Sequence, residues 1–114
     1  MGIGDLLQTK SDMKYQLVLQ WPGSSLKDYY EMIAMENKLI ENLSKGSKVD
    51  GHDAGSDEVN IFILTDDPEL TYSEAKAMLG NSDRWLSVRV AYREIAKSHY
   101  ITLWPEGLTD FRIA

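Results

Sequence analysis

The sequence predicts an α+β protein of the ferredoxin-like, split-βαβ class, with two helices on one face of a mainly antiparallel sheet. Segments with the residue pattern of strands and helices follow one another in the order β-α-β-β-α-β, and one further strand comes last. Each helical segment begins at a capping pattern and ends at a glycine. The 114 residues are enough for one domain, which we expect over residues 15–114 after an N-terminal extension at 1–14.

The first strand and the first helix have clear patterns. Tyr15–Trp21 is rich in β-forming residues, and its alternate positions predict one buried face. Ser25 then stands three residues before Asp28, close to a capping box. Apolar residues recur at three- and four-residue steps, which predicts a helix over Leu26–Ser44 that ends before Gly46.

A hairpin of two strands is expected next. Glu58–Thr65 has the strongest strand pattern in the chain, and Ser47–Asp53 is its irregular partner. The connection between them is expected at Ala54–Ser56. Alternate residues of the stronger strand should face the helices, namely Val59, Ile61 and Ile63.

The second helix and two more strands complete the predicted fold. A T-x-x-E capping box opens a short helix over Thr71–Leu79, which Gly80 ends. Trp85–Arg93 alternates as a fourth strand, and Tyr100–Trp104 is expected to form a hairpin with it as the fifth.

Composition excludes several classes of protein. The chain has no cysteine, which rules out a disulfide scaffold, a cysteine zinc site and a thiol nucleophile. Its net charge of −6 opposes nucleic-acid binding, which requires a surplus of Lys and Arg. The sequence shows no secretory pattern and no apolar run of membrane-spanning length, so we expect a cytoplasmic protein that does not bind membranes.

The most unusual segment is the acidic run Asp50-Gly51-His52-Asp53, which continues to Asp57. A metal site is one interpretation, because His52 with Asp50, Asp53 or Asp57 would suit Mn, Fe or Zn, although the spacing matches no standard ligand motif. Acid–base catalysis with Asp50 or Asp53 orienting His52 is a second, and recognition of a basic partner is a third. The simplest interpretation is structural, because Asp and Gly form tight turns, and we expect no bound metal or cofactor.

The segment from Val49 to Pro68 resembles small uncharacterised bacterial proteins that have an Asp-Gly-His-Asp hairpin ahead of an Asn-Ile-Phe strand. The resemblance covers about twenty residues. It implies a bacterial cytoplasmic setting and no catalytic residues.

The sheet face that points away from the helices is the second candidate site. Alternation places aromatic and arginine side chains there, namely Phe62, Trp85, Arg89, Arg93 and Trp104. Exposed aromatic patches are rare on monomers, so we expect this face to contact a partner protein or a second copy in a homodimer. Alternatively, residues 108–114 or the N-terminal extension cover it.

Three functions follow from these patterns. The preferred one is an acidic protein-interaction module without catalysis, such as an inhibitor or immunity-type protein that neutralises a basic enzyme. The first alternative is a metal-assisted hydrolase centred on Asp50, His52 and Asp53. The second is a small-ligand-binding regulatory domain, which rests on fold analogy.

Overall fold

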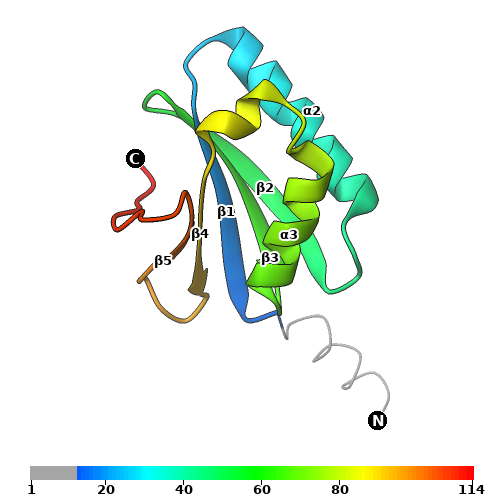
Figure 1. The fold of residues 1–114 in the computed structure, drawn as a ribbon, viewed down its shortest axis with the longest axis vertical. Helices are drawn as coiled ribbons and strands as arrows, with labels where there is room; N and C mark the ends of the chain where they lie inside the picture. The colour runs from blue at the N-terminus through cyan, green and yellow to red at the C-terminus, as the bar shows by residue number, and fades with distance from the viewer. Residues whose placement is uncertain (1–12) are drawn as a thin grey trace.

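The first strand, β1 (Tyr15–Pro22), lies at the centre of a five-stranded antiparallel sheet in the computed structural model, which describes residues 13–114 (Figure 1). The following elements are, in chain order, α2 (Leu26–Asn42), β2 (Ser47–Gly55), β3 (Glu58–Thr65), α3 (Pro68–Leu79), the 3-10 helix η1 (Asp83–Ser87), β4 (Arg89–Glu94) and β5 (Ile101–Trp104). The expected extension over residues 1–14 lies outside the described residues, except for its last two positions. No helix within 13–114 is long and apolar enough to cross a membrane.

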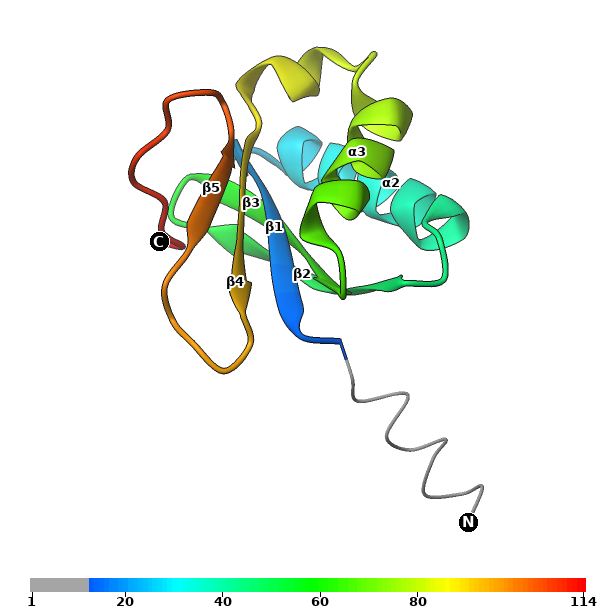
Figure 2. The ribbon, with the colours of Figure 1, turned by 60° about the horizontal axis from the view of Figure 1, so that its bottom comes forward.

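The strands lie side by side in the order β2-β3-β1-β4-β5. β1 pairs with β3 from Tyr15 opposite Thr65 to Pro22 opposite Glu58, and with β4 on its other side. Both helices cover the same face of the sheet, and Figure 2 shows that face on the side opposite the C-terminal segment. The chain is therefore an α+β protein compatible with the ferredoxin-like class.

The main core lies between the helices and the sheet. Alternation in β1 and β3 is confirmed there, because Leu17, Leu19, Ile61 and Ile63 are all fully buried. Residues of both helices pack on them, including Met32, Leu39, Ala75 and Leu79.

The two helix starts differ in how well they match the expectation. The capping box of α2 is confirmed: Ser25 Oγ accepts from the Asp28 N–H at 3.0 Å, and Asp28 Oδ2 accepts from the Ser25 N–H at 3.1 Å. The capping box expected at the start of α3 is wrong. That helix begins one turn earlier, with Asp67 as its N-cap, and Thr71 is buried with its hydroxyl 2.7 Å from that of Thr65.

The expected strand over Trp85–Arg93 is wrong in its first half. Residues 83–87 form η1, and β4 begins only at Arg89. Trp85 therefore does not follow period-two alternation, and its side chain is buried in the core on the helix side of the sheet. Trp85 is not part of the outer sheet face.

Trp104 is also misplaced by simple alternation. Its partner in β4 is Val90, whereas Thr102 pairs with Ala91, so β5 has one extra residue at this point. Such a β-bulge reverses which face the following residue points to. Trp104 consequently packs against the helix-side core, where Lys76 Nζ lies 5.5 Å from the centre of its ring.

The outer face of the sheet is covered from within the chain. Phe111 is buried against Val18 and Ala91, and Phe62 and Tyr100 pack around it. The expectation of an open aromatic interface on this face is therefore wrong, and the alternative in which residues 108–114 cover it describes the structure. With Phe111 seated on it, the face offers no open aromatic surface of the expected kind for a partner or a second copy to pack on.

Candidate functional site

The acidic hairpin lies at one edge of the sheet. β2 pairs with β3 on one side only, so its other side carries main-chain groups with no neighbouring strand among residues 13–114. Asp50, Asp53 and Asp57 are exposed along this hairpin, and we refer to them with β2 as the acidic edge. The pairing slips between Val49 and Gly51, which leaves Asp50 in a bulge. An acidic bulge of this kind discourages pairing with another acidic strand.

His52 is held by α2 and not by its neighbours in the hairpin. Its Nδ1 lies 2.9 Å from Oε1 of Glu36, whose side chain is only 10% exposed. Its Nε2 lies 3.4 Å from the hydroxyl of Tyr29, and the two rings meet edge to face at 5.7 Å. Because a carboxylate only accepts, Nδ1 donates to Glu36.

This geometry separates His52 from the carboxylates that the sequence grouped with it. His52 pairs with Ile61 and shares the helix side of the sheet, whereas Asp53 pairs with Asn60, which faces the other side. Within the part of the chain that the structure describes, no group of three or more His, Cys, Asp or Glu side chains is placed to hold a metal ion. The structure does not bring Asp50, His52 and Asp53 together as ligands.

An exposed apolar stripe on α2 runs beside the acidic edge. Leu26, Tyr30 and Ile40 are 72%, 64% and 59% exposed, and their spacing places them on one side of the helix. We refer to these three residues as the α2 stripe. Large apolar residues clustered on one helix side are typical of contact surfaces.

Two shallow cavities connect the α2 stripe with β2. The first, of about 320 Å³, is lined by Leu26 and Tyr29 of α2 and by Ala54–Asp57 of the hairpin. The second, of about 280 Å³, is lined by Ile40 together with Lys48 and Val49. Helix and strand thus share a grooved surface at both ends.

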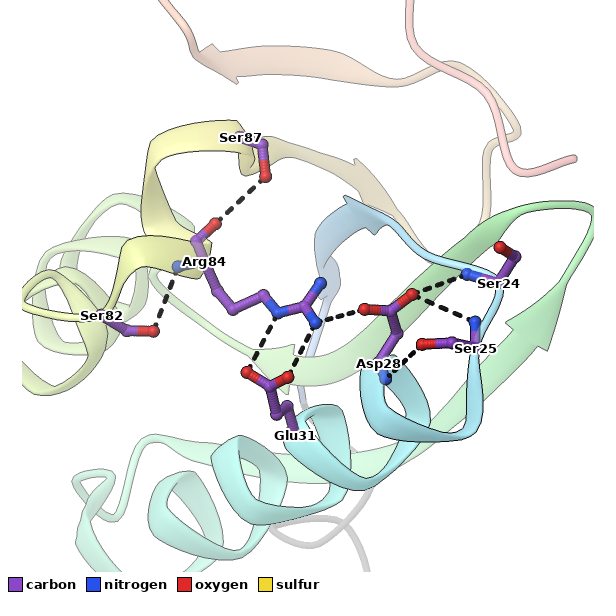
Figure 3. Close-up of polar contacts among 7 residues, drawn as sticks. All are labelled: Ser24, Ser25, Asp28, Glu31, Ser82, Arg84 and Ser87. Carbon is purple, nitrogen blue, oxygen red and sulfur yellow. Dashed lines mark hydrogen bonds and ion pairs between the residues drawn. The ribbon is translucent and has the colours of Figure 1, made fainter.

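An ion-pair cluster fixes the start of α2 to η1 (Figure 3). The Arg84 guanidinium donates to both oxygens of Glu31, at 2.8 and 3.3 Å, and to Asp28. Asp28 also accepts from the backbone N–H groups of Ser24 and Ser25. The Ser25 N–H and then Arg84 hold the pKa of Asp28 well below its usual value, and Arg84 lowers the pKa of Glu31 in the same way.

This cluster predicts a defined pH dependence. A carboxylate with a depressed pKa contributes stability above its unfolded pKa of about 4, and that contribution is lost as pH falls through the lower folded value. Asp28→Asn should therefore be less stable than the wild type at pH 7, and the difference should shrink as pH falls below about 4. Urea unfolding at several pH values measures this. Asp66→Asn, at an exposed acid outside the cluster, is the control, and a pH-independent difference for Asp28→Asn would contradict the account.

The two arginines expected on the outer face have internal partners. The Arg93 guanidinium donates to Gln16 Oε1 and to the backbone carbonyls of Ile95 and Lys97. These hydrogen bonds fix the loop between β4 and β5 to the sheet. Arg89 is exposed and approaches the carbonyl of Asp110 at 3.5 Å. Both side chains therefore act within the fold.

Sequence reasoning missed Glu36 and Arg84. A signal existed for Glu36, because it falls on the buried face of α2 among Met32, Met35 and Leu39, where a charged residue needs a partner. No such signal existed for Arg84, since its partners lie more than fifty residues away in the chain.

Comparison with known proteins finds no matching family model, no matching curated protein and no matching solved structure.

Proposed function

We propose that this chain is a ferredoxin-like protein-interaction module, without catalysis of its own, that binds a basic protein through the acidic edge and the α2 stripe. The observation that carries the proposal is the open side of β2, with exposed carboxylates on the strand and exposed apolar residues on the adjacent helix. An open strand edge accepts an extended segment of another protein through main-chain hydrogen bonds. The apolar stripe supplies the buried contact area that main-chain bonds alone lack.

Charge favours a basic partner over a second copy at this edge. The chain carries −6 overall, and β2 with its turn holds Asp50, Asp53 and Asp57 against one lysine, Lys48. Two copies paired through β2 would bring their acidic hairpins together, which repels. A basic partner would be attracted during encounter, as expected for an inhibitor or immunity-type protein acting in a bacterial cytoplasm.

The contacts of His52 with Glu36 and Tyr29 hold α2 and β2 together in this surface. They join α2 to β2 in the middle of the shared groove, between its two cavities. The helix and the edge strand would then present their residues to a partner as one rigid unit.

The apolar part of the proposal predicts a loss of affinity. The partner is first isolated by affinity capture from the source cell, and its binding is then measured with purified proteins. Leu26→Ala combined with Tyr30→Ala should weaken binding by at least about tenfold, because truncating central apolar contacts typically costs 1–3 kcal/mol. The matched control is Leu70→Ala with Leu86→Ala, which removes exposed apolar residues from α3 and η1.

The electrostatic part predicts a slower association. Asp50→Asn, Asp53→Asn and Asp57→Asn together should reduce the association rate at low salt by about tenfold, with a smaller effect at high salt. Asn also tolerates the positive φ of 65° at Asp57. The control removes three exposed charges elsewhere, by Asp66→Asn, Glu69→Gln and Glu106→Gln. Equal effects of both triple variants would contradict a specific role for the acidic edge.

A further inference from the structure

Residues 108–114, the tail segment, lie on the outer face of the sheet in the manner of a bound peptide. The segment belongs to no strand of the sheet, yet its side chains alternate in exposure from Asp110 to Ala114. Phe111 is buried and Ile113 half-buried, whereas Asp110 and Arg112 are exposed. Figure 2 shows this segment on the side of the sheet opposite the helices.

Side chains of the sheet bind the tail segment at every second carbonyl. The carbonyl oxygens of residues 108, 110 and 112 lie within hydrogen-bond reach of Thr102 Oγ1 at 2.7 Å, Arg89 Nη2 at 3.5 Å and Gln20 Nε2 at 3.1 Å, respectively. These contacts recognise an extended main chain, independently of its sequence.

A buried polar cluster completes the main-chain recognition. Gln20 and Asn60 are almost fully buried, and their amide nitrogens both donate to Glu58 Oε2, at 3.2 and 3.1 Å. The same Glu58 oxygen accepts from the Ala114 N–H at 3.0 Å. The cluster therefore presents one donor and one acceptor to the tail, at positions two residues apart, as an extended segment requires.

An apolar site on the sheet, which we call the seat, is formed by Val18, Ala91 and Tyr100 and selects the Phe111 side chain. Phe111 packs on Val18 and Ala91, both fully buried, and meets the ring of Tyr100 edge to face at 5.0 Å. An aromatic anchor in such a seat, with main-chain bonds on both sides of it, is how proteins bind extended peptides.

We propose that this outer face is a binding site for an extended segment with a phenylalanine anchor, and that two copies of this chain exchange their tail segments across it. The contacts are the same whichever copy supplies the segment, so exchange conserves them. The connection that must open is small and exposed. It consists of residues 105–107, in which Gly107 has a φ of 86° and one hydrogen bond joins the Leu108 N–H to the Pro105 carbonyl at 3.1 Å.

The test uses the full chain and a labelled peptide with the sequence of residues 108–114, followed by fluorescence anisotropy. Phe111→Ala leaves the seat intact and prevents the chain's own tail from filling it. This variant should bind the peptide at least about tenfold more tightly than the wild type, whose tail competes at an effective concentration near the millimolar range. A peptide with alanine in place of its phenylalanine is the control, and it should lose at least about tenfold in affinity.

Two further measurements make the outcome decisive. Phe111→Leu replaces Phe111→Ala if circular dichroism shows that variant unfolded. It loses the edge-to-face contact with Tyr100, so its tail should compete less well than that of the wild type, and it too should bind the peptide more tightly. Sedimentation of the wild type at increasing concentration should reveal a dimer that excess peptide dissociates. Absence of peptide binding to the folded variants would overturn the binding site. Peptide binding with a wild type that stays monomeric at millimolar concentration would overturn the exchange between copies.

Discussion

Trp85→Ala is expected to lower the free energy of unfolding by about 3–5 kcal/mol, the range typical of removing a large aromatic from a core. Trp85 is 7% exposed, stacks on Tyr72 with ring centres 6.3 Å apart, and meets Trp21 edge to face at 6.4 Å. Its loss would leave a cavity where α3, η1 and β1 meet, which the backbone can fill only in part.

The adjacent residue provides the matched control for this prediction. Leu86 belongs to the same 3-10 turn but is 88% exposed, so Leu86→Ala should change stability by no more than about 0.5 kcal/mol. Urea unfolding of both variants measures the difference. If Trp85→Ala left unfolding unchanged and weakened an association instead, Trp85 would lie on an interface and not in the core.

His52→Ala is expected to cost about 1–3 kcal/mol, because it leaves the Glu36 carboxylate nearly buried without its hydrogen-bond donor. His52→Leu combined with Glu36→Leu should recover most of that loss, since replacing both partners by apolar groups removes the unsatisfied charge. The measurement is the free energy of unfolding of His52→Leu, of Glu36→Leu and of the variant with both substitutions, beside that of His52→Ala.

Asp53→Ala is the control, because Asp53 follows His52 in β2 and points to the other face of the sheet. A loss for His52→Ala no larger than that for Asp53→Ala would show that Glu36 does not depend on His52. A loss in the double variant equal to the sum of the single losses would show that the two side chains act independently.

The predictable parts of this fold are those in which one simple period continues through an element. β1 and β3 alternate without interruption, and the sequence therefore predicts their helix-side residues correctly, as with Leu17 and Ile61. The expectation of only one buried face for β1 is wrong, because Val18 and Gln20 on the other face are buried as well. Trp85 and Trp104 were misplaced because a 3-10 turn and a bulge each break the period, and neither has a reliable sequence signal.

The candidate site divides in the same way. The acidic hairpin and its turn residues could be recognised from composition, because Asp and Gly mark turns. The partners of His52 could not, since Glu36 and Tyr29 come from a helix that lies earlier in the chain and reaches β2 only through the tertiary fold. From the sequence, the outer face could be an open interface or could be covered by another part of the chain. The contact of Phe111 with Val18, which shows that residues 108–114 cover it, is visible only in the structure.

Amide hydrogen exchange, measured in the free protein and in the complex with the captured basic partner, tests the central claim most directly. If the partner adds a strand to the acidic edge, amides of β2 (Ser47–Gly55) should gain at least about tenfold protection, while those of the opposite edge strand, β5 (Ile101–Trp104), should stay unchanged. Protection confined to β5 or α3, with none gained in β2, would contradict the proposed binding edge.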